Sequence, residues 1–299
     1  MENLRKTTER PVVRTGRNRF TLITFLLLSM TLSVSAQEVD SVIYKQIDTV
    51  ALQMDIYYPE QMEAGRDYPA MVFFFGGGWN GGSVSQFEPH ARYLSKRGIV
   101  CFLADYRVRS RQKTTPFESL MDAKSAIRYI RKNAARFRID PDQLIASGGS
   151  AGGHLAAATA LVQPYNESTD DLSVSCVPNA LVLFNPVIDN GPGGYGFERI
   201  GEHFYAFSPL HNIRAGAPPT IFFLGTEDRL IPVATGEYYQ TVMEKVGSRC
   251  DLHLYEGAGH GFFNYRSPEF YYHTVLETDK FLESLGYLEG EPTLRLKVE

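Results

Sequence analysis

Short apolar runs recur along the chain, and stretches with a different periodicity separate them. The runs hold continuous apolar or β-branched residues: Met71–Phe75, Ile99–Ala104, Gln143–Ala146, Ala180–Phe184 and Thr220–Leu224. A strand that is covered on both faces has this pattern, because neither of its faces needs polar residues. The five runs therefore predict the buried strands of a parallel sheet.

The stretches between these runs have the three- and four-residue spacing of amphipathic helices. The clearest is Phe117–Phe137, where apolar residues such as Ile127 and Ile130 recur on one face. Further helices are expected at Gln86–Arg97, Ala151–Leu161, Val233–Val246 and Tyr271–Leu285.

The segments Val42–Asp48 and Ala51–Tyr58 alternate between apolar and polar residues instead, and they predict an antiparallel hairpin at the sheet edge. Strands that alternate with helices predict an α/β fold with a doubly wound, mostly parallel central sheet. In such a sheet the functional site lies at the carboxyl ends of the strands.

The first 36 residues differ from the rest. Basic residues dominate residues 1–19, an uncharged apolar run extends from Phe20 to Val34, and Val34–Ala36 forms a small-x-small junction. This order is typical of a secretory signal peptide. The apolar run is shorter than the roughly 20 residues of a spanning helix, which disfavours a membrane anchor. We expect a signal peptide over residues 1–36, one domain over residues 37–299, no stable membrane insertion, and a periplasmic or secreted protein.

The net charge of the chain limits its expected partners, and its cysteine content limits the expected disulfide and metal sites. The chain has a net charge of −4, and residues 1–36 carry six basic and two acidic side chains, so the remainder is near −8. An acidic surface argues against nucleic acid as a partner, because phosphate binding needs a basic face. Cys101 lies in an apolar run and predicts a buried thiol, whereas pairing of Cys176 with Cys250 stays open. No His/Cys spacing suggests a metal site, and no cofactor is expected.

Residues 148–152 read Gly-Gly-Ser-Ala-Gly between a predicted strand and a predicted helix. In this setting G-x-S-x-G places the serine on a sharp turn, with its hydroxyl pointing out of the sheet. Gly148 and Gly152 suit the strained and crowded backbone there, since they have no side chains. A glycine-rich turn that merely connects two elements is the alternative, and the flanking elements favour Ser150 as a nucleophile.

A serine hydroxyl needs a base within hydrogen-bond reach, and the base needs an orienting carboxylate. On such a scaffold the acid and then the histidine follow the serine in the chain. Asp228 follows the run TIFFLGTE, and His260 lies in GAGHGF after the run DLHLYEG. Glu227 is the rival acid, and Asp228 is favoured because it begins a turn, Asp-x-Leu-Ile-Pro, that leads into a helix. The other histidines lack a glycine-flanked position at a strand end.

Residues 73–79 read FFFGGGW at the end of another predicted strand. Three glycines allow backbone N–H groups to face a reacting centre without side-chain obstruction. The expected oxyanion hole consists of the N–H groups of Gly77, Gly78 and Ala151, and one such donor contributes roughly 3–4 kcal/mol in the transition state. A flexible glycine-rich turn is the alternative.

Together the motifs FFFGGGW, GGSAGGHLA, GTEDRLIP and GAGHGF resemble the α/β-hydrolase esterases related to hormone-sensitive lipase, above all the secreted bacterial acetyl- and feruloyl-esterase-like family. The resemblance extends from Val42 to Gly286. It implies a serine carboxylesterase that cleaves small acyl esters of small molecules or plant polysaccharides. Many relatives carry a His where Phe75 stands, which leaves the geometry of the glycine loop open. The Tyr106-Arg107 pair also matches the family, where it looks structural.

Alternative functions stay open: an arylformamidase or exopeptidase on the same scaffold, or a non-catalytic recognition module, which the intact triad disfavours. The stretch Asp189–Tyr205 is rich in glycine and aromatic residues and is expected to border the pocket. Trp79, Tyr195 and Tyr205 are candidates for an aromatic wall that suits sugar rings or a phenolic acyl group. The stretch is too short for a large lipase lid, so we expect acetyl esters to be preferred over long acyl chains. A surface loop without a substrate role is the alternative.

Overall fold

The computed structural model describes residues 39–294, so the predicted signal peptide lies outside the described residues. One eight-stranded sheet organises this part of the chain, with the order β1-β2-β4-β3-β5-β6-β7-β8. The strands are β1 (Val39–Ile47), β2 (Val50–Tyr57), β3 (Tyr68–Phe74), β4 (Val100–Ala104), β5 (Ile139–Gly149), β6 (Ala180–Phe184), β7 (Thr220–Gly225) and β8 (Cys250–Tyr255). The pairings from β4 to β8 are parallel, and β1 and β2 form an antiparallel hairpin that also pairs antiparallel with β4.

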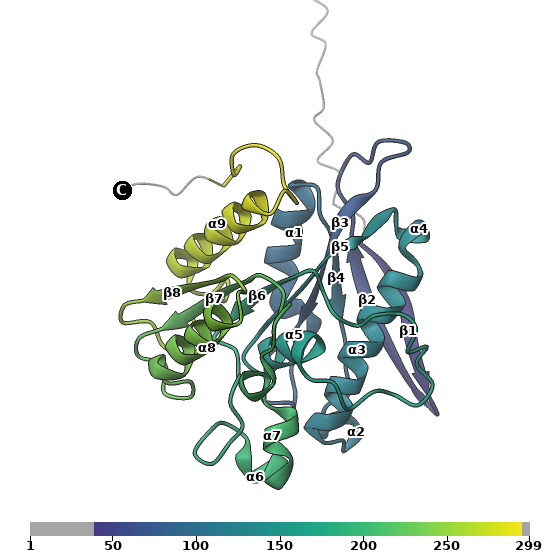
Figure 1. Cartoon of the computed structure of the whole chain (residues 1–299). Helices are drawn as coiled ribbons and strands as arrows, with labels where there is room; N and C mark the ends of the chain where they lie inside the picture. The colour runs from purple at the N-terminus through teal and green to yellow at the C-terminus, as the bar shows by residue number, and fades with distance from the viewer. Residues whose placement is uncertain (1–38, 295–299) are drawn as a thin grey trace, which may run out of the picture. The chain divides into compact units, whose positions relative to one another are not determined.

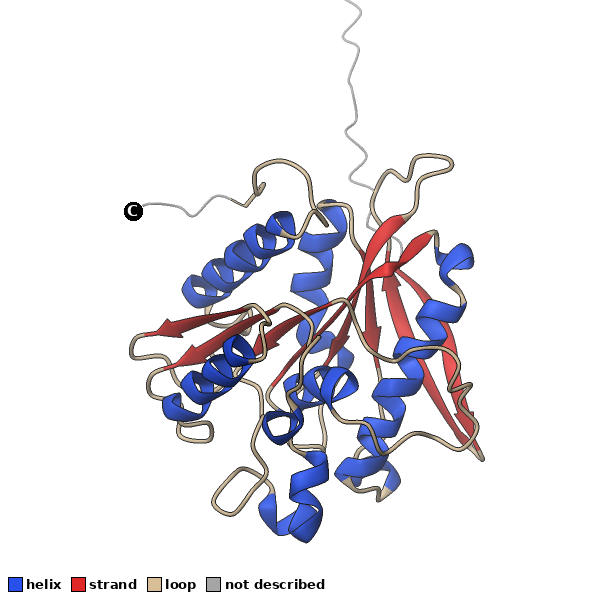
Figure 2. Ribbon diagram, viewed as in Figure 1, coloured by secondary structure: helices blue, strands red, loops and turns tan. Residues whose placement is uncertain are grey.

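Helices cover both faces of the sheet, as a doubly wound fold requires (Figures 1 and 2). Helices α1 (Glu88–Lys96) and α9 (Pro268–Ser284) lie on one face, and α3 (Pro116–Lys132), α5 (Ala151–Leu161) and α8 (Val233–Lys245) lie on the other. The described residues also form short α-helices: α2 (Arg109–Gln112), α4 (Ala134–Phe137), α6 (Phe197–Ile200) and α7 (Phe204–Phe207). The predicted fold class is confirmed.

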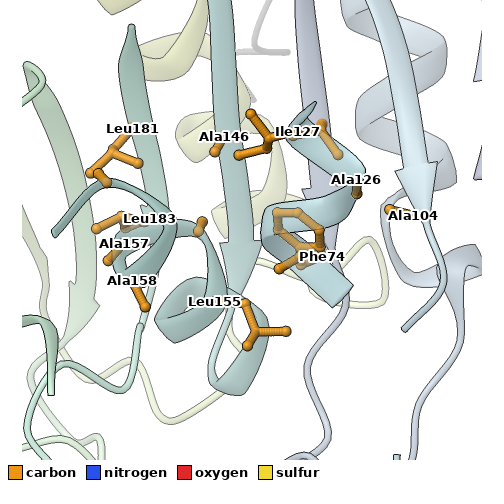
Figure 3. Close-up of a cluster of buried hydrophobic side chains, with 14 of the residues drawn as sticks. Phe74, Ala104, Ala126, Ile127, Ala146, Leu155, Ala157, Ala158, Leu181 and Leu183 are labelled. Carbon is orange, nitrogen blue, oxygen red and sulfur yellow. The ribbon is translucent and has the colours of Figure 1, made fainter. Parts of the chain in front are cut away.

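Successive residues of the central strands enter opposite cores, which explains their continuous apolar sequence. In β3, Val72 and Phe74 face α3 and α5, whereas Met71 and Phe73 face α1 and α9. Figure 3 shows Phe74 among side chains of α3 and α5 such as Ile127. Full burial of one such side chain contributes about 1.5–3 kcal/mol, so both faces stabilise the sheet that carries the site.

The predicted helix over residues 117–137 is divided in the structure. Thr115 and Glu118 form a capping box at its start, and Pro116 takes the first helical position, as expected for a helix N-terminus. α3 ends at Lys132, because the Asn133 side chain donates to the Tyr129 carbonyl oxygen at 2.8 Å and its backbone leaves the helical region. The last residues of the predicted helix form the separate turn α4.

A buried ion cluster fixes the hairpin to the layer of helices. Asp122 of α3 accepts from Lys45 of β1 at 2.7 Å, and its two oxygens each lie 2.8 Å from an Arg107 nitrogen. Glu167 contacts both cations. Such a cluster tolerates the loss of a partner poorly, because an unpaired buried charge costs about 3–5 kcal/mol. Arg107 therefore has the structural role that the family resemblance implies.

Cys101, Cys176 and Cys250 are free thiols, so Cys176 and Cys250 do not pair. Among residues 39–294, no helix is both long and apolar enough to cross a bilayer.

Candidate active site

Ser150 lies on the turn between β5 and α5, with φ 54° and ψ −119°. A non-glycine residue in this conformation is strained by about 1–3 kcal/mol and persists only where its surroundings hold it. The backbone N–H of Ser150 donates to the Phe184 carbonyl oxygen of β6 at 3.0 Å, and its own carbonyl accepts from Val187 at 3.1 Å. The turn is thereby fixed to the neighbouring strand, with the serine at the carboxyl edge of the sheet.

The two flanking glycines are required by close backbone approach. A Cβ atom on Gly152 would lie 2.0 Å from the Phe74 carbonyl oxygen, and one on Gly148 would lie 2.3 Å from the Gly152 oxygen. Side chains at either position would push the nucleophile turn away from β3. In the G-x-S-x-G pattern the two glycines thus satisfy local packing, and Ser150 between them is the candidate nucleophile.

The structure brings Ser150, His260 and Asp228 together, although they follow three different strands. His260 Nε2 lies 2.9 Å from Ser150 Oγ, and His260 Nδ1 lies 2.7 Å from Asp228 Oδ2. The Asp228 side chain is fully buried, and its Oδ1 accepts from the backbone N–H groups of Leu230 and Ile231 at 2.8 and 3.0 Å. The turn that singled out Asp228 in the sequence therefore orients its carboxylate.

Glu227, the rival acid, has an exposed side chain. Its backbone N–H donates to the Ala258 carbonyl oxygen at 3.0 Å, which leaves Asp228 as the carboxylate that contacts His260.

Asn185 completes this arrangement and was not predicted from the sequence. It follows β6, between the strands that carry the serine and the acid, and it is fully buried. Its Nδ2 lies 3.4 Å from His260 Nε2, and its Oδ1 accepts from the Gly261 N–H at 2.9 Å. The available signal was its position: a polar residue directly after the buried run ALVLF falls at the carboxyl edge of the sheet.

The glycine loop lies directly against the nucleophile turn. A Cβ on Gly76 would lie 3.4 Å from Ser150 Cβ. Gly77 and Gly78 adopt φ angles of 126° and 63°, a region that favours glycine. Their N–H groups donate to no acceptor in the described part of the chain, whereas the Gly76 N–H donates to Gln86 Oε1 at 2.7 Å. Ala151 begins α5, where the first N–H groups have no acceptor within the helix. The three predicted donors are thus available for an oxyanion.

Phe75 supports the glycine loop at the position where the family resemblance implies a histidine. Its ring stacks on Tyr106 with centroids 4.1 Å apart and planes 16° apart, and the Tyr106 hydroxyl donates to the Phe75 carbonyl oxygen at 2.6 Å. Gln86 adds a second support, because its Nε2 donates to Asn264 Oδ1 at 2.9 Å while its Oε1 holds Gly76. The geometry that the sequence left open is therefore held by an aromatic stack and an amide bridge.

The predicted aromatic wall does not form. Trp79 is only 1% exposed, and its ring packs in the core against His154, with centroids 5.1 Å apart. Tyr195 lies beside it at 6.0 Å, but Tyr205 is 67% exposed and contacts His211 instead. Trp79 adopts a positive φ of 56°, and its side chain is almost completely buried.

A strained serine on a strand-to-helix turn, a histidine and a buried carboxylate, in contact at the carboxyl edge of a doubly wound sheet, define the hydrolase class. Comparison with known proteins agrees. The family model described as BD-FAE matches residues 54–190, and the dienelactone hydrolase family model matches residues 197–288. The apo form of Thermogutta terrifontis esterase 2 is 43% identical with a TM-score of 0.81, over 84% of this chain and 96% of that chain.

The curated proteins that this chain resembles in sequence are also esterases. An acetylxylan esterase of Xylanibacter ruminicola is 29% identical over 87% of this chain and 52% of its own length. A probable isoprenylcysteine alpha-carbonyl methylesterase of Arabidopsis thaliana is 27% identical over 70% of this chain and 48% of its own length. The chain therefore spans about half the length of the curated relatives it matches. The chain belongs to the α/β-hydrolase esterase family, and these relatives are carboxylic ester hydrolases.

Proposed function

We propose that this chain is a secreted serine carboxylesterase that hydrolyses small acyl esters through an acyl-enzyme on Ser150. The observation that carries the proposal is the continuous chain of contacts from Ser150 Oγ to His260 Nε2 at 2.9 Å and from His260 Nδ1 to Asp228 Oδ2 at 2.7 Å. A hydroxyl, a base and an orienting carboxylate in this order are the parts that nucleophilic acyl transfer needs.

In the first half-reaction Ser150 Oγ attacks the ester carbonyl carbon while His260 Nε2 accepts the hydroxyl proton. The carbonyl oxygen becomes an oxyanion and accepts hydrogen bonds from the N–H groups of Gly77, Gly78 and Ala151. Collapse of this intermediate breaks the bond to the alcohol oxygen, which takes the proton from His260. In the second half-reaction water attacks the acyl-enzyme, His260 accepts a proton from it, and the proton returns to Ser150 as the acid leaves.

Asp228 holds His260 in the tautomer that carries a proton on Nδ1 and stabilises the imidazolium that forms in both steps. Its burial and its two backbone N–H donors fix the carboxylate in one orientation. Asp228 therefore acts through the histidine and does not contact the ester.

The proposed acyl group is acetyl or feruloyl in type, carried by a small molecule or a plant polysaccharide. A related esterase supports a short acyl group and a nucleophile that an organophosphate modifies. Thermogutta terrifontis esterase 2 has been solved with propionate and with butyrate bound, and phosphorylated by paraoxon. The acetylxylan esterase among the relatives supports a polysaccharide ester. Export rests on the signal-peptide pattern of residues 1–36, and the N-terminal sequence of the exported protein tests it.

The decisive experiment is labelling with a fluorophosphonate probe, followed by turnover of p-nitrophenyl acetate and of acetylated xylan. We expect the wild type to be labelled and active, and Ser150→Ala to lose both properties while its circular dichroism stays unchanged. Labelled or substantially active Ser150→Ala would assign the chemistry to another residue. Turnover of N-formylkynurenine with none of either ester would favour the arylformamidase alternative.

A further inference from the structure

A cavity of about 200 Å³ lies beside the glycine loop, apart from the contacts among Ser150, His260 and Asp228. Its wall includes Trp79, Thr114 and three cationic residues, Arg109, Lys113 and Arg199. The first residues of α3 close it. We call it the Arg109–Arg199 cavity.

The cavity lies next to the glycine loop, because Trp79, one of its lining residues, directly follows Gly78. Its residues come from the segments that follow β3, β4 and β6, and two of these strands, β3 and β6, flank β5, whose end carries Ser150. Figure 1 shows α2 and α6 at the same edge of the sheet. Arg199 Nη1 donates to the Gly78 carbonyl oxygen, and the Arg109 N–H donates to the Trp79 carbonyl oxygen at 3.0 Å. A ligand group in the cavity would therefore lie beside the glycine loop that carries the proposed oxyanion donors Gly77 and Gly78.

The positive charge of the cavity is largely uncompensated. Arg109 and Lys113 have no ion-pair partner among residues 39–294, and no carboxylate lines the cavity. Arg199 pairs through Nε with Glu198 at 3.0 Å, and the Glu198 side chain is 72% exposed. In a domain with a net charge near −8, three cations around one small cavity stand out. Such a cluster attracts an anion and raises its local concentration.

Two buried polar atoms of the lining residues also lack partners. Trp79 Nε1 and Thr114 Oγ1 have no hydrogen bond within the described residues. Buried polar groups are nearly always satisfied in native proteins, and an indole N–H can only donate. Both groups can donate to an acceptor oxygen, which is the chemistry that a carboxylate offers. Glu118, the acidic residue of the first turn of α3, is instead bound to the Thr115 N–H at 2.8 Å.

We propose that the Arg109–Arg199 cavity is a subsite for the carboxylate of an acidic sugar on the alcohol side of the ester. The inference rests on the proposed function. A small acyl group such as acetyl has no carboxylate, so the anion has to come from the alcohol. The cavity is smaller than the roughly 300 Å³ of the smallest drug-sized pockets, so it suits one charged group and not a whole oligosaccharide. The substrate class is therefore an acylated oligosaccharide with a uronic acid branch.

The test compares acetylated xylo-oligosaccharides with a glucuronic acid branch and neutral acetylated xylo-oligosaccharides of equal length. The measured quantity is the ratio of the two kcat/KM values, in which any general loss of activity cancels. We expect the wild type to favour the acidic substrate, and Arg109→Gln to lower the ratio about tenfold, as expected for one charge-assisted hydrogen bond. Arg109→Gln with Lys113→Gln lowers it further. Lys245→Gln removes an exposed cation at the end of α8 and leaves the ratio unchanged.

A wild-type ratio near one, or a ratio that Arg109→Gln does not change, overturns the inference about the cavity. Turnover of p-nitrophenyl acetate tests the proposed esterase activity separately. Calorimetry with Ser150→Ala provides a second arm that needs no turnover. Binding of a glucuronic acid-bearing xylo-oligosaccharide that Arg109→Gln weakens supports the subsite, even if no ester is hydrolysed. Binding of inorganic phosphate alone, without binding of the oligosaccharide, would make the cavity a site for free anions and contradict the inference.

Discussion

Asn185 Nδ2 lies 3.4 Å from His260 Nε2, the same nitrogen that faces Ser150 Oγ at 2.9 Å, while Asn185 Oδ1 accepts from the N–H of Gly261 at 2.9 Å. One buried amide thus contacts both the imidazole and the backbone next to it. The contact pattern makes Asn185 a positioning residue, because it restrains the loop that carries the proposed base.

We expect Asn185→Ala to lower kcat about tenfold to a hundredfold with little change in KM, because a displaced base loses the near-attack geometry. Asn185→Asp keeps the size of the side chain but adds a negative charge that favours the imidazolium form of His260. The acidic limb of its pH–rate profile should therefore move to higher pH. Steady-state kinetics on p-nitrophenyl acetate across pH measure both effects. A variant Asn185→Asp with the wild-type profile would reduce Asn185 to a packing residue.

Asp228→Asn should lower kcat by about 10⁴, the effect that the loss of the correct histidine tautomer has in serine proteases. Glu227→Gln is the matched control one residue away, and it should stay within about twofold of the wild type because its side chain is exposed. Both are measured on the same ester at neutral pH. The reverse pattern would transfer the role of the acid to Glu227.

Gly78→Ala should lower kcat about 10²–10³-fold, the cost of losing one oxyanion donor. An added Cβ would lie 2.5 Å from Tyr195 Oη and would displace the loop. The double variant with Tyr195→Phe removes that oxygen and should recover part of the activity. Gly65→Ala is the control, because it has a similar positive φ of 78° but no atom within 4 Å of the added Cβ. Equal losses in Gly78→Ala and Gly65→Ala would indicate backbone strain alone.

The ester series C2, C4, C8 and C12 tests the proposed size of the acyl group. We expect kcat/KM to be highest at C2 or C4 and to fall at least about tenfold by C8. The reason is that the segment between β6 and β7 forms short helices of three or four residues, such as α6 and α7, which cannot enclose a long chain. The rate should show no rise above the micellar threshold. A maximum at C8 or beyond would make the protein a lipase.

The buried histidine His90 makes the free energy of unfolding depend on pH. Burial lowers the pKa of His90 to about 3, and both ring nitrogens lack a hydrogen bond among the described residues. In the unfolded chain a histidine titrates near 6.5, so the unfolded state binds a proton that the folded state excludes. This contribution to stability is complete above pH 6.5 and is lost as the pH falls toward 3. His90→Phe should reduce the slope of unfolding free energy against pH by up to about 1.4 kcal/mol per pH unit.

Urea unfolding at pH 4, 5, 6 and 7 measures that slope. His273→Gln is the control, because it replaces a histidine of α9 that is exposed instead of buried. An unchanged slope in His90→Phe would mean that the acid sensitivity arises elsewhere.

The sequence by itself determined the sheet and the three residues of the Ser–His–Asp constellation. Ser150, Asp228 and His260 each follow an apolar run, and parallel strands bring their carboxyl ends to one edge. Gly148 and Gly152 marked the nucleophile turn, because neighbouring backbone atoms lie so close to both positions that no side chain fits there. These signals are local in the chain, and the topology of a doubly wound sheet converts them into spatial proximity.

Only the tertiary structure decided what surrounds the Ser–His–Asp constellation. Asn185 contacts His260, Arg199 donates to the Gly78 carbonyl oxygen, and the Trp79 side chain is almost completely buried directly after the glycine loop. No periodicity or motif in the sequence predicts these contacts. Each contact joins segments that lie far apart in the chain, and it depends on how the segments after the strands fold over the strand ends. The burial of a single side chain depends on how its neighbours pack around it. The residue type at one position therefore does not predict whether that side chain is buried.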